Sequence, residues 1–457
     1  MTLPLFQYQD VGAQFMANRH IAGLLDEMGV GKTATAIRAS EYAIAERGLI
    51  ISPAMLRENW VAEHRKFSNA GYRICKGLNI HDYMAWKRGK YDIMVTSYEQ
   101  ATKWTDDMVS GGFLLDFLVM DEFHYLKNSG AARTKKILGP KFNGLGGIPS
   151  ICEHVWPMTG TLMPNDPLDS YTFLALCDVL NGMTQNKFIK TFFYQYKTAY
   201  GSRTIPRPDT LADLQALIYN NALRRTAAEV GIFLPPIFLT SSVVDGDTQA
   251  VMDMLKSHPG MDKAILDAVE SGGLSFLDSQ HIMTLRRLIG EAKAVPYAEL
   301  LLEEIRGGST KRVVFGIHVD ALTSIRDYLQ KNGVRCALVN GLVSEKVSNQ
   351  AIYDFQNDAT MEVIILNMRK GGLGITLTAS CEIDLFESDW APGPNVQAIK
   401  RIARIGQERK MRARFIMLAH SFEELVIRIV SGKTAAIAQV EGDVMLAAPM
   451  DVVQQFM

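Results

Sequence analysis

One loop constrains this chain more than any other stretch, the segment LLDEMGVGKT at residues 24–33. The apolar run from Ile21 to Leu25 predicts a short buried strand in front of it. The Ala-rich stretch from Ala34 to Arg47 predicts a helix behind it, ending at Gly48. Glycines let backbone N–H groups approach phosphates, and a helix N-terminus adds partial positive charge. The segment therefore predicts a nucleotide-binding site.

Two side chains would carry the chemistry of this loop. Lys32 is expected to reach the outer phosphates, and the Thr33 hydroxyl to ligate Mg²⁺. Asp26 occupies the position where such a loop usually has its first glycine. An ordinary strand-to-helix turn with a surface lysine is the alternative interpretation. Upstream, the amide of Gln9 could pair with the amino group and a ring nitrogen of adenine, which predicts selection of ATP.

Length and composition restrict the class of protein. At 457 residues the chain exceeds one comfortable core, so two or three domains are expected. The formal net charge of −1 argues against a protein coated in nucleic acid. Neither a membrane-spanning run nor a secretion signal is expected. The five cysteines are scattered without zinc-ligand spacing, so we expect reduced thiols and a cytoplasmic protein.

Polar groups follow the predicted strands of the first part of the chain. The apolar run that ends at Met120 delivers Asp121 and Glu122, the first suited to assist Mg²⁺ and the second to polarise the attacking water. An acidic strand terminus without function is the alternative. Similar strand ends occur near Pro53, Ser97 and Thr159. Short strands that alternate with helices and carry functional groups at their carboxyl ends predict a parallel sheet in an α/β lobe.

The alternation stops and later resumes. Helices are expected in the middle of the chain at Tyr171 to Leu180, Lys187 to Tyr196, Leu211 to Arg225 and Gln280 to Ile289. Strands then recur near Val313, Leu338, Ile364 and Ile383. We therefore predict an α/β lobe at residues 1–168, a helical insertion or linker at 169–296, and a second α/β lobe with a C-terminal helical segment at 297–457.

The second lobe carries two arginines three positions apart, Arg401 and Arg404, which we expect on one face of a helix. Such arginines can stabilise transition-state charge on a γ-phosphate. An exposed basic helix is the alternative, since charge runs are usually solvated.

Taken in order, these motifs resemble the SNF2 family of superfamily 2 ATPases. The resemblance covers nearly the whole chain, and the DEMGVGKT and RIGQ segments are its most specific parts. Its markers are Tyr8–Gln9, Asp26 to Thr33, Ile51 to Ala54, Thr96 to Glu99, Asp121 to His124, Thr159 to Thr161, Gly371 to Thr376 and Gln397 to Gln407.

The resemblance implies two RecA-like parallel-sheet lobes with ATP and Mg²⁺ between them and DNA across the top. It implies that Gln9 selects adenine and that Gly29, Gly31, Lys32 and Thr33 hold the phosphates. Thr33 and Asp121 would serve Mg²⁺, and Glu122 would be the catalytic base. Arg401 and Arg404 would be arginine fingers, Gln397 would order the cleft, and Thr159 and Thr161 would couple the ATP state to lobe motion. The DNA backbone contacts it implies are Pro53, Ala54, Ser97, His318, Gly341, Gly372 and Thr376.

Some positions depart from the family pattern. Phe123 replaces an alanine, Met368 a threonine or serine, and Ala403 a histidine, while no proline directly follows Thr161. No catalytic group is lost, so these departures bear on coupling to DNA more than on ATP hydrolysis. The compact chain resembles prokaryotic or phage members, near the annealing-helicase branch.

The expected function is an ATP-dependent double-stranded DNA translocase. It would bind double-stranded or branched DNA through the backbone, independently of sequence and sensitively to salt. It would remodel DNA by branch migration, fork regression or annealing, or displace bound proteins, as a monomer that meets replication or recombination proteins and no membrane. A strand-separating DNA or RNA helicase and an ATP-switched binding protein are the alternatives.

Overall fold

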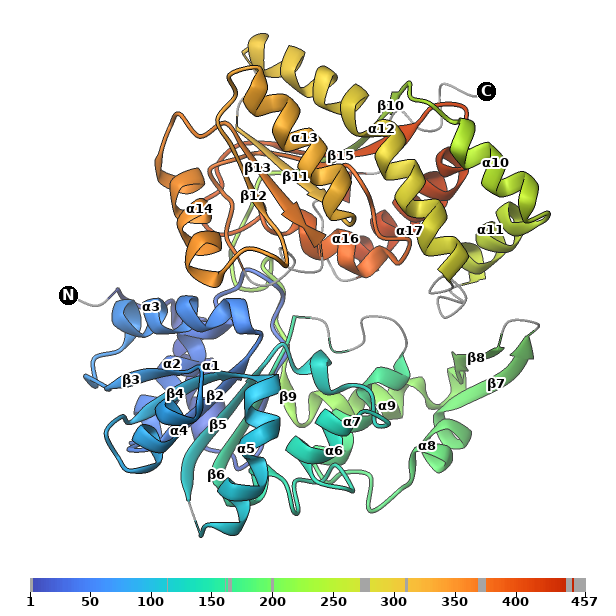
Figure 1. Ribbon diagram of the computed structural model, residues 1–457. Helices are drawn as coiled ribbons and strands as arrows, with labels where there is room; N and C mark the ends of the chain where they lie inside the picture. Colours follow the sequence, from blue (N-terminus) through green and yellow to red (C-terminus); the bar gives the residue numbers. More distant parts are fainter. Residues whose placement is uncertain are drawn as a thin grey trace. The chain divides into compact units, whose positions relative to one another are not determined.

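The computed structural model describes residues 3–112, 114–160, 162, 167–198, 201–271, 280–308, 311–368, 375–440 and 446–447. The chain divides into two compact units, Met1–Gly231 and Ile232–Met457 (Figure 1).

The described part of the first unit is built on a seven-stranded sheet with the order β3-β4-β2-β5-β6-β1-β9, in which each neighbouring pair is parallel. Its strands are β1 (Gly23–Leu24), β2 (Gly48–Ser52), β3 (Ile74–Gly77), β4 (Ile93–Ser97), β5 (Leu115–Asp121), β6 (Cys152–Met158) and β9 (Ala222–Leu223). Its helices are α1 (Gln7–Ala17), α2 (Lys32–Tyr42), α3 (Arg57–Phe67), α4 (Ile80–Lys87), α5 (Tyr98–Ser110), α6 (Ala132–Leu138), α7 (Tyr171–Leu176), α8 (Gln185–Phe192) and α9 (Leu211–Tyr219). An antiparallel hairpin, β7 (Phe193–Thr198) and β8 (Gly201–Pro206), adds a small separate sheet.

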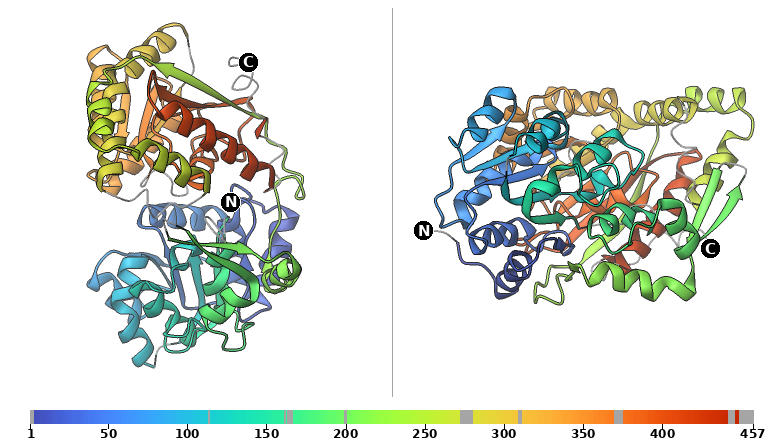
Figure 2. Two further views of the ribbon diagram at one scale, coloured as in Figure 1. Left: turned by 90° about the vertical axis from the view of Figure 1, so that its right-hand side faces the viewer. Right: turned by 90° about the horizontal axis from the view of Figure 1, so that it is seen from below.

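The second unit contains another seven-stranded parallel sheet among its described residues, with the order β12-β13-β11-β14-β15-β10-β16. Its strands are β10 (Ile237–Val244), β11 (Arg312–Gly316), β12 (Cys336–Val339), β13 (Val363–Asn367), β14 (Glu382–Leu385), β15 (Met411–Leu418) and β16 (Leu446–Ala447). Its helices are α10 (Gln249–Ser257), α11 (Met261–Ser271), α12 (Gln280–Arg306), α13 (Val319–Lys331), α14 (Glu345–Asn357), α16 (Pro392–Ile399) and α17 (Glu423–Val440). Figure 2 shows the long strand β10, which pairs with β15 over its whole length.

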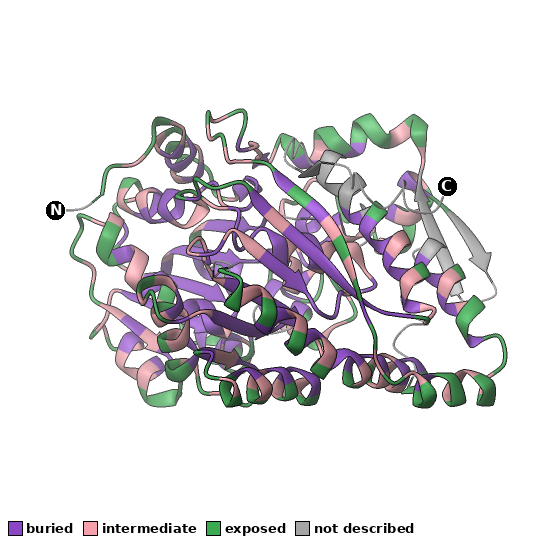
Figure 3. Ribbon diagram, turned by 90° about the horizontal axis from the view of Figure 1, so that it is seen from above, coloured by how far each residue is buried: buried purple, intermediate pink, exposed green. Residues whose placement is uncertain are grey.

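The central strands of both sheets are nearly continuous apolar runs because both of their faces are covered. β2, β4, β11 and β13 are buried at every position. Figure 3 shows buried residues gathered along the strands inside the molecule and exposed residues on the outer helices. Rings pack directly on the sheet: Phe117 stacks on Trp156 with 5.3 Å between ring centroids. The Phe117 ring also fills the space that a Cβ on Gly48 would need, so this glycine is a packing requirement. The predicted α/β class with two parallel-sheet lobes is confirmed.

The helix predicted after the phosphate loop has different ends in the structure. It begins at Lys32, two residues before Ala34, and ends at Tyr42, not at Gly48. Gly48 is the first residue of β2. The chain leaves the helix early because Asp116 accepts hydrogen bonds from the backbone N–H groups of Glu46 and Arg47, both at 2.6 Å, and so holds the turn into β2.

The prediction that residues 169–296 are helical is wrong in part. Strands β7 and β8 form a hairpin where only helix was expected, and β10 belongs to the second sheet. The helix predicted from Leu211 to Arg225 ends at Tyr219, because the following residues pair with β1 as strand β9. The three-part domain division stays a prediction. Within residues 169–296, β9 belongs to the first seven-stranded sheet and β10 to the second.

Two class expectations can be compared with the structure. The five cysteines, all of them among the described residues, lie outside any disulfide. Among the described residues, no helix combines the length and apolar character needed to cross a bilayer.

A buried ion cluster stabilises the second sheet. Asp384 accepts from Arg414 Nη2 at 2.8 Å, from Arg312 Nη1 at 3.0 Å and from the Tyr297 hydroxyl at 2.8 Å, and Glu304 bridges both arginines. Burial by itself would raise the pKa of Asp384, but the two guanidinium groups outweigh it and hold the pKa below its usual range. The cluster is balanced only while every member is present.

We expect the substitution Asp384→Asn to lower the free energy of unfolding by about 3–5 kcal/mol, because it removes the fully buried carboxylate that Arg312 and Arg414 share, while Glu304, which also bridges them, is partly exposed. Urea-induced unfolding checks this. The matched control is Glu291→Gln in the exposed Arg287–Glu291 pair, which should change the free energy by no more than about 0.5 kcal/mol. Equal effects of the two substitutions would contradict the argument.

Buried His64 predicts acid sensitivity of the first unit. Its ring is 2% exposed and lies near Trp60 and Tyr72, each at 6.3 Å between centroids. Burial lowers its pKa from 6.5 to about 4. The unfolded chain therefore takes up this proton at a higher pH than the folded chain, so stability is full above pH ~6.5 and falls as the pH drops toward 4.

Between about pH 7.5 and about pH 5, this histidine should cost about 2 kcal/mol of folding free energy. His64→Phe should remove that part of the pH dependence, measured by urea-induced unfolding at both pH values. An unchanged pH dependence in the variant would show that other groups cause it.

Candidate active site

The phosphate loop has the backbone that its sequence predicts. It runs from the end of β1 to the first residue of α2, with Gly29 at φ 86° and Gly31 at φ 85°, a region that favours glycine. The side-chain amide of Gln9 fills the space where a Cβ on Gly31 would lie. The loop is therefore closed around a tight turn whose amide groups precede a helix N-terminus, which is the arrangement that binds phosphate.

Lys32 and Thr33 open α2 at the mouth of this loop. The Lys32 ammonium donates to the carbonyl oxygens of Asp26 at 2.7 Å and Glu27 at 3.0 Å. These carbonyls hold the positive charge inside the loop, where it is within reach of an incoming phosphate. Thr33 is half-buried in the first turn of the helix.

Strand register brings the acidic pair to the same edge of the sheet as the loop. Met158 of β6 is the register partner of Leu24 in β1 on one side and of Asp121 in β5 on the other. Neighbouring strands lie about 4.8 Å apart, so the loop and the carboxylates are separated by a single strand. The backbone N–H of Thr159 donates to the Leu24 carbonyl at 3.2 Å and fixes this junction.

Asp121 is held rigidly in a buried position. Its carboxylate accepts from Trp60 Nε1 at 2.8 Å and from the Glu122 backbone N–H at 3.0 Å. Burial and the neighbouring Glu122 charge raise its pKa to about 7, against the opposing effects of Trp60 and Lys32. A buried carboxylate with a raised pKa is relieved by a bound cation, so this position fits Mg²⁺ together with Thr33.

Glu122 adopts an unusual backbone conformation. It lies in the left-handed region at φ 54°, ψ 53°, directly after β5. A glutamate there is strained, which is common where a side chain must be aimed at a reaction. Its Oε2 lies 3.3 Å from His124 Nδ1, and the same nitrogen lies 3.2 Å from Thr159 Oγ1. His124 thus connects the predicted base with Thr159.

His124 and Arg225 are two residues to which the sequence interpretation gave no role. His124 belongs to the acidic motif Asp121 to His124, and its place two residues after Glu122 is a usable signal. Arg225 forms an ion pair with Asp26, with 2.5 Å between Nη2 and Oδ2. The signal in the sequence is Asp26, a carboxylate in a phosphate loop, where a negative charge needs a cationic partner.

Gln9 lies against the phosphate loop. It is 4% exposed, its Nε2 donates to the Gly31 carbonyl at 3.3 Å, and its Oε1 accepts from the Phe6 backbone N–H at 3.0 Å. The structure therefore places Gln9 beside the phosphate loop, and its selection of adenine stays a prediction.

In the second unit, the predicted arginine pair is not helical. Helix α16 ends at Ile399, and Arg401 and Arg404 lie in the turns that follow. Gln407 causes this change of direction: its buried amide donates to the carbonyls of Ser380 at 2.7 Å and Ile402 at 3.3 Å, which pulls the chain out of the helix.

The arginine loop, residues 401–407, is also hydrogen-bonded to the segment in front of β14. The Leu377 N–H donates to the Arg401 carbonyl at 2.9 Å, and Arg404 Nη1 donates to Thr376 Oγ1 at 3.0 Å. A predicted finger and a predicted DNA contact are thus joined. Gln397, on α16, is half-buried.

The other predicted DNA contacts lie at strand ends and turns. Ser52 and Ser97 are register partners, so Pro53, the 3₁₀ turn at Ala54 and Ser97 share one edge of the first sheet. The Ser97 hydroxyl accepts from the Gln100 N–H at 3.3 Å and caps α5. Gly341 is exposed in a turn. Thr161 and Gly372 lie outside the described residues.

His318 is engaged within its own unit. Its Nδ1 lies 2.6 Å from Glu387 Oε1, and its backbone N–H donates to Glu387 Oε2 at 2.8 Å. Burial would raise the pKa of Glu387, but His318 and the backbone donors outweigh it and lower the pKa. A DNA contact by His318 stays a prediction, and it would have to compete with these bonds.

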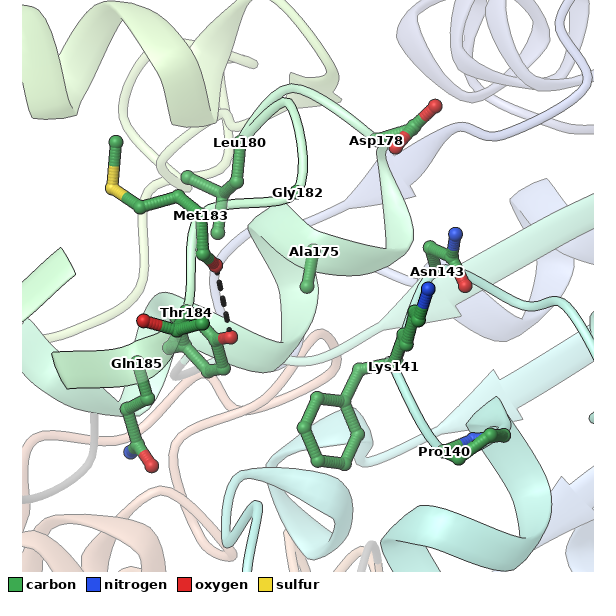
Figure 4. A pocket seen from close by; sticks show the side chains of 12 residues that line it. Pro140, Lys141, Asn143, Ala175, Asp178, Leu180, Gly182, Met183, Thr184 and Gln185 are labelled. Carbon is green, nitrogen blue, oxygen red and sulfur yellow. Dashed lines mark hydrogen bonds between the residues drawn. The ribbon is translucent and has the colours of Figure 1, made fainter. Parts of the chain in front are cut away.

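A cavity of about 410 Å³ lies elsewhere in the first unit (Figure 4). It is lined by residues 140–143 together with parts of α7, α8 and their connection, and the Tyr171 hydroxyl donates to the Met183 carbonyl at 3.1 Å beside it. None of the predicted site residues lines this cavity. The candidate nucleotide site therefore rests on its chemistry and not on this cavity.

Comparison with known proteins gives matches to two family models along the chain. The model of the SNF2-related domain matches residues 8–244, and that of the helicase conserved C-terminal domain matches residues 296–406. The chain is 24% identical over 473 residues to the SWI/SNF-related matrix-associated actin-dependent regulator of chromatin subfamily A member 1 of Mus musculus, covering 93% of this chain and 42% of that protein. It is 25% identical to chromodomain-helicase-DNA-binding protein 9 of Mus musculus, covering 92% of this chain and 16% of that protein.

The chain thus spans less than half the length of these relatives. Among solved structures, the Sulfolobus solfataricus SWI2/SNF2 ATPase core in complex with dsDNA aligns with 22% identity and a TM-score of 0.43, covering 97% of this chain and 94% of that one.

The site geometry predicts separate losses for the lysine and the glutamate. Glu122→Gln should lower the ATP hydrolysis rate by about 10²–10⁴-fold while nucleotide still binds, because the amide cannot accept the proton of water. Lys32→Ala should weaken nucleotide binding itself. Steady-state hydrolysis and a nucleotide titration distinguish the two, with the exposed Glu99→Gln as control. Unchanged hydrolysis in Glu122→Gln would mean that another residue is the base.

Proposed function

The chain belongs to the SNF2-related family, and we propose on this basis that it is an ATP-driven translocase on double-stranded DNA. The observation that carries the proposal is the junction of β1, β6 and β5, which sets the phosphate loop and the Asp121–Glu122 pair at one sheet edge with only β6 between them. A parallel sheet presents its functional groups at the carboxyl ends of its strands, so this edge is where ATP would be hydrolysed.

In this proposal the chain's own residues divide the work. The glycine loop and Lys32 bind the phosphates, and Thr33 with Asp121 holds Mg²⁺, which supplies charge neutralisation when bound. Glu122 orients and deprotonates the attacking water, and His124 Nδ1 lies 3.3 Å from its carboxylate. Arg401 and Arg404 stay the predicted arginine fingers.

Coupling to motion would run through Thr159. Its backbone is bonded to the end of β1, and its hydroxyl faces the imidazole that contacts Glu122. A change at the γ-phosphate that moves Glu122 would therefore be felt at Thr159 and in the chain that follows β6. The predicted DNA contacts at Pro53 and Ser97 stand at the same edge of the same sheet.

Contacts to the DNA backbone carry no base information, so binding would be independent of sequence and weakened by salt. We further propose that stepping along DNA remodels branched structures or displaces bound proteins during replication, recombination or repair. The chromatin remodelling named for the relatives is not carried over, since this chain spans only part of those proteins.

The test is ATP hydrolysis by the wild type and Lys32→Ala, alone and with duplex DNA, forked DNA, single-stranded DNA or RNA. We expect duplex or forked DNA to stimulate the wild type by about tenfold or more and the variant not at all, because translocation couples hydrolysis to the grip on DNA. Stimulation mainly by single strands or RNA would favour the helicase alternative.

A second assay separates the two motor classes. A translocase should displace a triplex-forming strand from duplex DNA in an ATP-dependent reaction without separating the duplex. Robust unwinding of plain duplex would contradict the non-separating mechanism.

A further inference from the structure

The phosphate loop contains a buried carboxylate, Asp26, whose negative charge opposes the binding of phosphate. Asp26 is 1% exposed and sits at the base of a loop that must receive phosphate anions. A buried negative charge there would repel the ligand and is costly to desolvate. The structure compensates it with one residue from the end of the first unit, Arg225.

Arg225 makes a two-pronged bond to this carboxylate. Its Nε donates to Asp26 Oδ1 at 3.0 Å and its Nη2 to Oδ2 at 2.5 Å. The Arg225 side chain is 14% exposed, so the pair is shielded from water. A fork of this kind fixes orientation as well as charge, which a lysine cannot reproduce.

The same guanidinium is enclosed by α1. Its remaining nitrogen, Nη1, donates to the Tyr8 carbonyl, and its central carbon lies 5.1 Å from the centre of the Tyr8 ring. Tyr8 in turn donates its hydroxyl to the Val30 carbonyl of the loop at 2.7 Å. A Cβ added to Gly12 would lie 2.7 Å from Nη2 and 3.0 Å from Cγ2 of Thr35, so the space is full.

The backbone on either side of Arg225 is paired with the loop. Leu25 N–H donates to the Leu223 carbonyl at 2.8 Å, and Glu27 N–H to the Arg225 carbonyl at 2.9 Å. The Ala227 N–H donates to Glu27 Oε2 at 2.8 Å. Residues 221–227 therefore follow β1 and the start of the loop step by step, just before the first unit ends at Gly231.

We propose that Arg225 is a positioning residue of the nucleotide site, which sets the phosphate loop by neutralising and orienting Asp26. Lys32 donates to the Asp26 carbonyl, so the orientation of Asp26 decides where the phosphate-binding ammonium stands. The proposal rests on the proposed function, because it concerns the same ATP site. It also makes residues 221–227 the part of the first unit that must shift whenever the base of the loop shifts.

The experiment compares Arg225→Gln, Arg225→Lys, Asp26→Asn and the double variant Arg225→Gln/Asp26→Asn with the wild type. Nucleotide Kd is measured by calorimetric titration with ADP and Mg²⁺, and kcat and KM by steady-state ATP hydrolysis. Circular dichroism and thermal unfolding confirm that each variant is folded.

We expect each Arg225 variant to raise Kd and KM by about tenfold or more while kcat stays within about threefold, because the bound state restores the geometry that the free loop has lost. The double variant should lose much less than the two single losses multiplied together, since the partners act as a unit. The matched control is the exposed Arg207–Asp209 pair, 3.4 Å apart, whose variants Arg207→Gln and Asp209→Asn should change Kd by less than about twofold.

Gly12→Ala keeps both charges and favours the helix in which it lies, yet its methyl group would crowd Arg225 and Thr35. It should raise Kd as well, and it tests the inference if Arg225→Gln does not fold. Unchanged Kd and KM in a folded Arg225→Gln or Gly12→Ala, with the wild type binding nucleotide, would overturn the positioning role and leave the proposed function intact. A wild type that binds no nucleotide would overturn both.

Discussion

The placement of β1 between β6 and β9 is the constraint on which the chemistry of the first unit depends. β1 is only two residues long, yet it pairs in parallel on both sides, and this pairing fixes where the phosphate loop leaves the sheet. Through the shared partner Met158, the same register sets Asp121 one strand away. A slip of one residue would turn every side chain to the opposite face and separate the loop from its carboxylates. The strand itself is too short to be stable alone, so its neighbours hold it.

Two of the buried carboxylates beside this strand, Asp26 and Asp121, are held in opposite ways. Asp26 is neutralised inside the protein by the Arg225 fork, so it adds little net charge to the phosphate site. Asp121 receives only neutral donors, from Trp60 and the Glu122 backbone, and burial raises its pKa to about 7. One carboxylate is thus satisfied before a ligand arrives, while the other retains its affinity for a cation. This difference separates a structural acid from an acid suited to Mg²⁺.

In the second unit, too, internal hydrogen bonds hold the predicted functional residues in place. Its arginine loop is bound through the Gln407 amide and through the Arg404–Thr376 contact, so the residues expected to meet a phosphate are joined to residues expected to meet DNA. In the second sheet, Arg312 on β11 and Arg414 on β15 both pair with buried Asp384 on β14, and so hold these three strands together. A close-packed sheet transmits a small displacement from one loop to another, because its strands move together as one rigid body.

The sequence by itself determined whatever depends on neighbouring residues. Apolar runs predicted the buried strands, and the glycine loop and the acidic strand end predicted Lys32, Thr33, Asp121 and Glu122, because those groups follow their strands directly. The resemblance supplied the family and the order of the lobes. Local reasoning failed where a distant segment decided the outcome: the helix predicted through Arg225 gives way to β9, and the predicted helix at Arg401 and Arg404 ends early because Gln407 bonds elsewhere. Only the tertiary structure could join Asp26 to Arg225 across 199 positions or His124 to Thr159 across 35, since pairing of buried charges and strands depends on distance in space and leaves no periodic signal in the chain.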